Sequence, residues 1–320
     1  MADKQNRSPL MSLYRTYSDY LSERFPYKMQ KLTVNAGFTC PNRDGSKGRG
    51  GCIYCNNQSF NPSFSSRGES VTAQLEKGKR FFARKYPDMH YLAYFQAYTN
   101  THSDNIDHLM DLYREALSVP DVEGVIIGTR PDCMPERLLR ELASLNSFPG
   151  KVMIEYGAES ANNATLDLIN RCHTWEDTVE ACQRTAQAGI DCGIHLILGL
   201  PGETIPDMMR TVDLTMQLPI QTVKFHQLQV IRGTTLATMM EKKELEVTPF
   251  TIDSYLDLCA EIVRRTPPHI AIERFTSQSP DELLISPRWG IKNYQFAQLL
   301  ANRLRVCLNL CANDFEDIFG

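Results

Sequence analysis

The sequence lacks any apolar run near the length of about 18 residues that a membrane-spanning helix needs. It also lacks the apolar segment and the small-residue cleavage site of a secretory signal, because residues 1–21 are polar and rich in tyrosine. Neither sign of charge dominates, since the formal net charge is −4 at pH 7. We therefore expect a cytoplasmic protein that does not associate with membranes.

No repeat, low-complexity linker or clean domain boundary interrupts the 320 residues. A chain of this length can bury a large core, either as one sizeable domain or as two small ones. We expect an N-terminal helical segment over 1–30 and a core over 31–236. A C-terminal extension over 237–320, with helices and a possible extra strand, is expected to pack on the core without forming an independent domain.

Short apolar runs alternate with segments in which apolar residues recur at helical spacing. The candidate strands lie at 31–38, 91–98, 124–129, 151–157, 193–200 and 223–231. Consecutive β-α units join parallel strands by right-handed crossovers. The expected fold is therefore α/β, a partial (β/α)6 TIM-type barrel of parallel strands, with a doubly wound open sheet as the alternative. A further run at 269–275 extends the sheet or covers its open side.

Three of the ten cysteines gather in "CPNRDGSKGRGGCIYC", directly after the first predicted strand. A structural zinc ion normally takes four protein ligands, and no second C-x2-C pair follows Cys40, Cys52 and Cys55. Three thiolates on a cubane of four irons would leave one iron open to another ligand. The pattern favours such a cluster, shielded by Tyr54. A zinc site with His102 as the fourth ligand is the alternative.

This loop resembles the cluster motif of the radical S-adenosylmethionine (SAM) superfamily, in the long-spacing form shared with the Elongator catalytic subunit. The usual superfamily spacing is C-x3-C-x2-C, whereas eleven residues separate Cys40 from Cys52 here. The stretches "AGFTCPNRDG" and "QAYTNT" resemble a small bacterial branch of the superfamily, the YhcC-like radical proteins. The resemblance extends over roughly residues 30 to 236.

Two further segments resemble the family's SAM-binding loops. "QAYTNT" is similar to the loop that holds the amino group of SAM, so Thr99 and Asn100 are the candidates there. "EYGAESANNATLDLINRCHT" is similar to a stretch that places Glu159 at a glutamine position and Arg171 at the position of an arginine that contacts the methionine carboxylate. A planar guanidinium suits a carboxylate. A salt-bridge role at the barrel mouth is the alternative for Arg171.

The stretch "GIHLILGLPGET" resembles the strand whose backbone meets the adenine in the family. Ile197 and Gly199 occupy the matching positions, and His195 stands where relatives often carry aspartate. A buried, hydrogen-bonded structural histidine is the alternative for His195. "QLQVIRGTTL" (227–236) is similar to the family's sixth-strand ending.

Two other thiols, Cys133 and Cys172, fall near strand ends, where a thiol could donate a hydrogen atom or receive a radical. Core filling is the more common role of a free cysteine. Core filling is also expected for Cys307 and Cys311, which share one face of the last predicted helix. The basic, aromatic run at 76–85 is expected to be an outer amphipathic helix.

The resemblance implies a [4Fe-4S] cluster and SAM as cofactors, with an electron donor such as a flavodoxin or ferredoxin. It implies reductive cleavage of SAM to methionine and a 5′-deoxyadenosyl radical, and it points to tRNA, modified at the wobble uridine, as the substrate. The sequence has no long basic arm, and only local clusters at Lys77–Lys85, Arg264–Arg265 and Arg303–Arg305 could contact RNA. A radical enzyme for a small metabolite or peptide, and a non-enzymatic zinc-binding α/β scaffold, are the alternatives.

Overall fold

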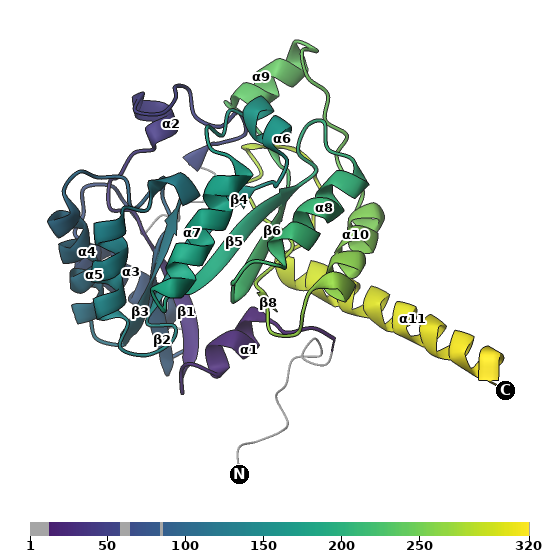
Figure 1. Ribbon diagram of the computed structural model, residues 1–320, viewed down its shortest axis with the longest axis horizontal. Helices are drawn as coiled ribbons and strands as arrows, with labels where there is room; N and C mark the ends of the chain where they lie inside the picture. The colour runs from purple at the N-terminus through teal and green to yellow at the C-terminus, as the bar shows by residue number, and fades with distance from the viewer. Residues whose placement is uncertain (1–12, 58–64, 84–85, 320) are drawn as a thin grey trace.

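The computed structural model describes residues 13–57, 65–83 and 86–319, with side chains in the last helix described as far as Val306. Seven parallel strands form one sheet in the order β1-β2-β3-β4-β5-β6-β8, curled into a half-barrel (Figure 1). The strands are β1 (Lys28–Val34), β2 (Met89–Phe95), β3 (Val122–Thr129), β4 (Val152–Glu159), β5 (Asp191–Leu198), β6 (Thr222–Gln227) and β8 (Ala271–Ile272). The strand order never reverses, so the partial barrel is confirmed and the doubly wound sheet is wrong.

Helices cover the convex face of the sheet (Figure 1). They are α3 (Val71–Ala83), α4 (Ile106–Ser118), α5 (Glu136–Leu145), α7 (Trp175–Gln187), α8 (Ile205–Thr215) and α10 (Ile252–Arg265). Their apolar faces and the outward side chains of the strands share one large buried core. Within its described part, the basic run at 76–85 belongs to α3 and is an outer helix, as expected.

The two faces of β4 show how the sequence separates the outer core from the interior of the half-barrel. Successive side chains of a strand point to opposite faces. Ile154 and Tyr156 pack in the core with the helices. Glu155, Gly157 and Glu159 face inward and line a cavity. The inward side of β4 therefore places polar side chains in the interior of the half-barrel.

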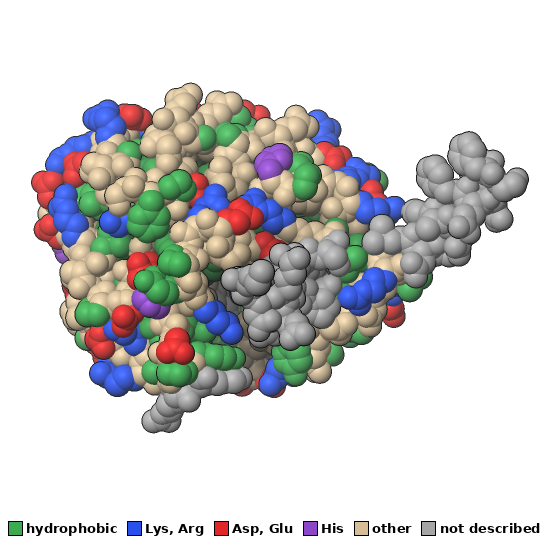
Figure 2. Space-filling view, turned by 90° about the horizontal axis from the view of Figure 1, so that it is seen from below, with side chains coloured by type: hydrophobic (Ala, Val, Ile, Leu, Met, Phe, Trp, Pro, Cys, Tyr) green, Lys and Arg blue, Asp and Glu red, His purple; other side chains and the backbone are tan. Residues whose placement is uncertain are grey.

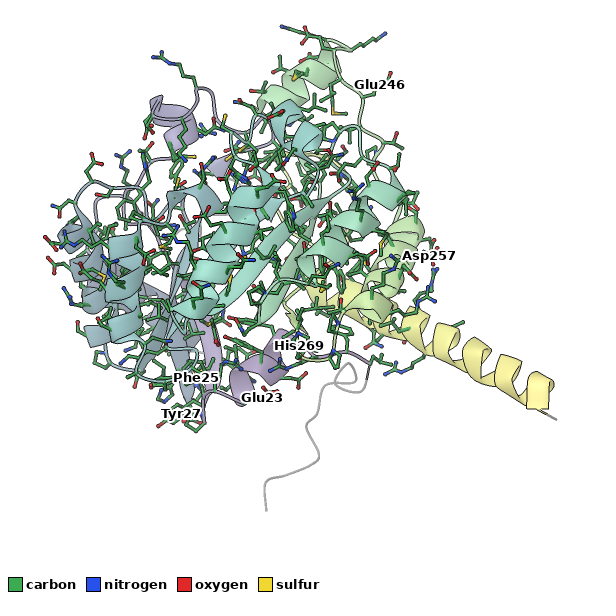
Figure 3. All side chains as sticks on the ribbon, in the orientation of Figure 1. Glu23, Phe25, Tyr27, Glu246, Asp257 and His269 are labelled. Atoms are coloured by element: carbon green, nitrogen blue, oxygen red, sulfur yellow. The ribbon has the colours of Figure 1, made fainter. Side chains whose placement is uncertain are left out.

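A short helix, α1 (Tyr17–Ser22), covers the amino-terminal end of the half-barrel. Phe25, just after it, packs in a second buried cluster with residues from β2, β3 and β4. Figure 3 shows Glu23, Phe25 and Tyr27 at this end and Glu246 at the opposite end of the molecule. The amino-terminal end is thus packed, and the carboxyl ends of the strands carry the loops.

The expected strand limits differ from the observed ones at both edges of the sheet. The first strand begins at Lys28 and ends at Val34, so residues 35–38 lie outside the strand and have no regular secondary structure. The run at 223–231 divides into β6 and a separate β7 (Val230–Ile231), which pairs antiparallel with β9 (Leu284–Ser286). The run at 269–275 contributes β8, which pairs parallel with β6 and extends the sheet.

The remaining helices follow the sheet or lie in its loops: η3 (Pro131–Cys133), α2 (Pro41–Asp44), α6 (Asn163–Leu168), α9 (Thr235–Glu241) and α11 (Asn293–Phe319). The side chains of Cys307 and Cys311 lie outside the described residues, so their expected core role stays a prediction. In the part of the chain that the structure describes, every helix is too short or too polar to cross a lipid bilayer.

Candidate functional site

A cavity of about 400 Å³ opens inside the half-barrel at the carboxyl ends of the strands. Predicted site residues from five separate segments line it: Cys40, Cys52, Tyr54, Cys55, Thr99, Glu159, Arg171, His195 and Ile197. Asn100, Gly199, Cys133 and Cys172 are not among its lining residues. The carboxyl ends of parallel strands meet at one edge of a barrel, which is why residues so distant in sequence face one another.

The three-cysteine loop is folded by its own backbone hydrogen bonds. Helix α2 follows Cys40 directly, and Gly45 ends it in the left-handed conformation with φ 93°. The amide of Gly51 donates to the carbonyl of Asn42 at 2.8 Å, and the amide of Cys55 donates to the carbonyl of Cys52 at 3.0 Å. These turns direct all three thiols toward the one cavity.

Cationic groups lie beside the thiols. An Arg171 guanidinium nitrogen lies 3.4 Å from the sulfur of Cys52, and Arg43 donates to the backbone carbonyl of Cys55 at 3.0 Å. Burial, together with the neighbouring Cys52 thiol, raises the pKa of Cys55 to about 11. Three adjacent thiolates therefore need a bound cationic centre, which the irons of a cluster would supply.

The donor set fits an iron–sulfur cluster. The thiols of a cubane ligate different irons, so they surround an inorganic core and do not converge on one point. Among the described residues, no group of three or more His, Cys, Asp or Glu side chains is arranged to hold a single metal ion. His102, the candidate fourth zinc ligand, lies with its Nε2 2.9 Å from a carboxylate oxygen of Asp44.

Arg171 is buried at the cavity wall and has four partners. It donates to the Gly157 carbonyl at 2.5 Å and to Nε2 of His173 at 2.9 Å. Its guanidinium also lies 3.3 Å from Glu159 and contacts Cys52. Burial, and then the charge of Arg171, lower the pKa of His173 to about 3, so this ring is neutral and accepts the hydrogen bond. Arg171 therefore forms an ion pair and also lines the cavity, and its contact with SAM stays a prediction.

The segment that carries Arg171 is set by an unusual backbone. Glu159 has φ 69°, and the pairing of β4 with β5 shifts register between Gly157 and Glu159. A β-carbon on Gly157 would lie 2.7 Å from a guanidinium nitrogen of Arg171, so a larger residue there would displace that side chain. Such strained, bulged strand ends often redirect side chains at functional sites.

Of the other predicted cofactor residues, some line the cavity and others lie behind its wall. Thr99 and Ile197 line the cavity, whereas Asn100 is buried behind it and donates to the carbonyls of Phe95 and Gly128 at 2.9 and 2.8 Å. Gly199 has φ 87° and faces the ring of Phe250 at a distance that leaves little space for a β-carbon. The described contacts of Asn100 and Gly199 therefore support the loops behind the cavity wall.

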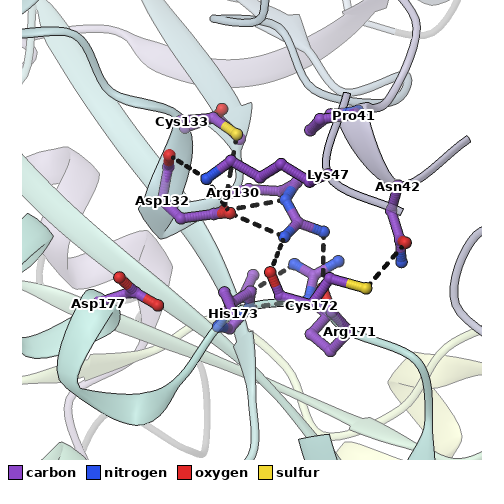
Figure 4. A network of polar contacts seen from close by, with 12 residues as sticks. Pro41, Asn42, Lys47, Arg130, Asp132, Cys133, Arg171, Cys172, His173 and Asp177 are labelled. Carbon is purple, nitrogen blue, oxygen red and sulfur yellow. Dashed lines mark hydrogen bonds and ion pairs between the residues drawn. The ribbon is translucent and has the colours of Figure 1, made fainter. Parts of the chain in front are cut away.

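A buried ion pair that the sequence reasoning missed joins the loops around the cavity (Figure 4). The Arg130 guanidinium donates to both carboxylate oxygens of Asp132, each at 2.9 Å, and to the backbone carbonyl of Arg171 at 2.8 Å. Lys47, from the cysteine loop, lies 2.6 Å from Asp132. Arg130 directly follows β3, and this strand-end position is the signal that could have identified it.

Cys133 and Cys172 take part in the same network. The Cys133 thiol lies 3.5 Å from an Asp132 carboxylate oxygen, and the Cys172 thiol lies 3.1 Å from the side-chain oxygen of Asn42. Burial raises the pKa of both thiols, and that of Cys133 reaches about 12. Both groups are therefore neutral thiols beside the cluster loop, and a catalytic role for them stays a prediction.

A network of four charged groups lies inside the half-barrel, of which Glu155 and Lys224 are buried and Lys31 and Glu273 are half-buried. Lys31 contacts Glu155 and Glu273 at 2.6 Å each, and Lys224 contacts the same two carboxylates at 3.0 and 2.9 Å. His195 contacts Glu155 at 2.7 Å. His195 is therefore hydrogen-bonded as a structural histidine would be, and it also lines the cavity.

This network makes stability depend on pH. Burial alone would raise the pKa of Glu155, but Lys224 and Lys31 lower it well below its usual value, and the pKa of Glu273 is lowered in the same way. Because the folded-state pKa lies below the unfolded value of about 4.3, the stabilisation is complete above that pH and is lost as the pH falls. The fold also keeps His173 and His195 neutral, with pKa values below the unfolded value of about 6.5. We therefore expect the urea midpoint to be nearly constant above about pH 7, to decline as the pH falls below about 6.5, and to fall more steeply below about pH 4.5. A constant midpoint down to about pH 3 would contradict the ionised network.

Comparisons with known proteins agree with this geometry. The model of the radical SAM superfamily matches residues 39–215, and the model of the radical SAM C-terminal domain matches residues 220–305. The protein YhcC of Escherichia coli is 33% identical over 280 residues, covering 88% of this chain and 88% of its own length. The tRNA uridine(34) acetyltransferase of Methanocaldococcus infernus is 25% identical over 180 residues, which are 55% of this chain and 32% of that protein.

Among solved structures, the Elp3 protein of Methanocaldococcus infernus with an N-terminal deletion has the same fold at a TM-score of 0.62 and 17% identity. The likeness covers 87% of this chain and 63% of that chain. The resemblance to YhcC-like proteins that the motifs indicated is confirmed. The superfamily model spans more than half of the sequence, and the YhcC relative covers most of it. This chain belongs to the radical SAM superfamily of enzymes.

Proposed function

We propose that this protein cleaves SAM reductively at a [4Fe-4S] cluster held by Cys40, Cys52 and Cys55. The proposal rests on one observation. These three thiols come from one loop and line the same cavity as Arg171. When bound, the cluster supplies the electron that splits SAM into methionine and a 5′-deoxyadenosyl radical. A flavodoxin or ferredoxin is the class of partner that we expect to deliver the electron.

The chain's own residues would bind and orient SAM. Arg171 presents a planar cation to the methionine carboxylate, and Thr99 provides polar atoms for the amino group. Ile197 offers an apolar contact for the adenine. The hydroxyl of Tyr54 is buried with no hydrogen-bond partner among the described residues, so it is free to contact a ligand. With SAM bound, the walls of the half-barrel would limit the access of water to the reaction.

Release of 5′-deoxyadenosine tests the proposal. Protein reconstituted anaerobically with iron and sulfide is mixed with dithionite and SAM, and the nucleoside is quantified by chromatography. We expect 5′-deoxyadenosine to accumulate only when protein, reductant and SAM are all present. Protein that holds about four irons per chain and still releases none would contradict the proposal.

We further propose tRNA, modified at the wobble uridine, as the substrate. The support is the resemblance of the loops to the Elongator subunit and the similarity to the tRNA uridine(34) acetyltransferase of M. infernus. Binding to phosphates predicts that retention of tRNA falls steeply as salt rises. The nucleoside profile of tRNA from a deletion strain should lack one modified uridine. An unchanged profile would contradict this substrate.

The surface favours a second candidate substrate, a small metabolite or peptide. Each described basic cluster that could contact RNA is paired with carboxylates: Lys77 with Glu69 at 2.6 Å, Arg265 with Asp213 at 2.7 Å and Arg303 with Asp253 at 2.8 Å. Figure 2 shows that blue and red side chains are interspersed over the visible part of the face seen from below. Absence of salt-dependent tRNA retention would favour this candidate.

A further inference from the structure

One cation at the inner wall of the cavity, Arg274, forms no ion pair with any of the described residues. Arg274 follows β8 and lines the thiol-bearing cavity. It also lines a second cavity of about 340 Å³ on the α1 side, together with Lys31 and Glu273. None of the ion pairs among the described residues involves Arg274. Its Nε is buried and has no hydrogen-bond partner in the described part of the chain.

The neighbouring carboxylates are already shared by two lysines, so they compensate this cation only in part. Lys31 contacts one oxygen of Glu155 and one of Glu273, and Lys224 contacts the other oxygen of each. Two lysines and two glutamates therefore balance each other. Arg274 is half-buried and adds one positive charge in excess of these pairs, and removing a charge from water without an ion-pair partner is costly.

Other polar groups surround the guanidinium on the cavity side. His226 lines the cavity, and its Nδ1 contacts the hydroxyl of Ser277. Burial, and then the charge of Arg274, lower the pKa of His226 well below its usual value, so its ring is neutral. With Nδ1 engaged, Nε2 of this ring has no partner among the described hydrogen bonds.

The loop beside Arg274 is held in a fixed position. Gln227 accepts a hydrogen bond from the amide of Ser277 at 2.7 Å and donates to its carbonyl at 3.0 Å. Gln229 donates to the same carbonyl at 3.2 Å and accepts from the hydroxyl of Ser279 at 2.7 Å. The wall that carries Arg274 is therefore preorganised, which favours tight binding of a ligand.

We propose that Arg274, with His226 beside it, forms an oxyanion site that binds a carboxylate or phosphate group of the substrate. A planar guanidinium can hold either group through two parallel hydrogen bonds. The site lies on the wall of the cavity formed by the ends of β6 and β8, whereas the thiols come from the loop after β1. This assignment rests on the proposed function only in naming the bound molecule as the substrate.

Equilibrium binding of simple anions tests the site. The probes are inorganic phosphate and acetate, added at constant ionic strength with chloride as the replacement anion, to the reconstituted protein without SAM. We expect one or both to raise Tm, and the stronger effect identifies the substrate group as phosphate or carboxylate. In Arg274→Met the dissociation constant of the anion that binds should rise by at least about tenfold.

Arg184→Met is the matched control. Arg184 is also a partly exposed arginine, but it lies on α7 and donates to Glu136 at 3.0 Å. We expect this variant to bind the probes like the unaltered protein. Arg274→Met should keep or raise the Tm of the anion-free protein, because it removes an uncompensated charge, whereas a structural role for Arg274 would lower it. Arg274→Lys keeps the charge and is measured as well, with weakened binding expected.

Anion binding that is equal in the unaltered protein and both Arg274 variants, or absent from the unaltered protein, would overturn the site. These readouts need neither reductant nor SAM. A failure of the oxyanion site is therefore distinguished from a failure to release 5′-deoxyadenosine.

Discussion

Replacing Cys55 with alanine is expected to abolish both cluster binding and 5′-deoxyadenosine release while the chain stays folded. The thiol of Cys55 lines the cavity, and its removal leaves two thiols from the loop to hold a cubane that needs three here. A two-thiolate site would lose iron on gel filtration. Iron and sulfide per chain, the visible spectrum and the nucleoside yield measure the effect.

Cys259→Ala is the control for this experiment. Cys259 is fully buried on α10, in the core between the helix and the sheet. Its replacement should cost a small amount of stability and leave iron content and nucleoside yield unchanged. If folded Cys55→Ala protein released as much 5′-deoxyadenosine as Cys259→Ala protein, the loop would not hold the active cluster.

The substitution Asp132→Asn is expected to cause a large loss of unfolding free energy. Burial alone would raise the pKa of Asp132, but hydrogen bonds with Arg130 and Lys47 lower it far below its usual value, so the group is ionised. The substitution leaves the Arg130 guanidinium, with a side chain only 2% exposed, without its counter-charge. Removing one partner of a buried pair costs about 3–5 kcal/mol of unfolding free energy. Urea denaturation measures this loss.

Asp132→Asn should also weaken the hold on the cluster loop, because Lys47 of that loop contacts Asp132. We expect faster loss of iron to a chelator. Asp107→Asn is the control, since Asp107 forms an exposed pair with Arg137 that should contribute nothing measurable. Equal urea midpoints for the two variants would contradict the role of the buried network.

The sequence predicted the β/α alternation because five of the strands are nearly continuous apolar runs, as buried parallel strands are. It misjudged β1, whose beginning, Lys28–Lys31, is polar. Lys31 faces the interior of the half-barrel because Glu155 and Glu273 neutralise it there. These partners lie 124 and 242 residues away, so no local pattern could reveal them.

In the candidate site, too, contacts between residues distant in the sequence could not be predicted from local patterns. The cysteine pattern and the resemblance of neighbouring segments predicted the three cysteines, Arg171 and Thr99 as cofactor ligands, and the fold brings all five to one cavity. Arg130 and Arg274 were missed, because their importance depends on which carboxylates lie near them in space. Arg130 has a nearby counter-charge in Asp132, whereas the carboxylates near Arg274 are already engaged by lysines. Only the folded chain distinguishes a paired from an unpaired arginine.

Three thiols from the loop would leave one iron of the cluster free to bind SAM. The electron paramagnetic resonance spectrum of the dithionite-reduced, reconstituted protein, recorded with and without SAM, tests this directly. We expect a [4Fe-4S]+ signal whose g values shift when SAM is added. Identical spectra with and without SAM, from protein that holds a full cluster, would contradict an open iron.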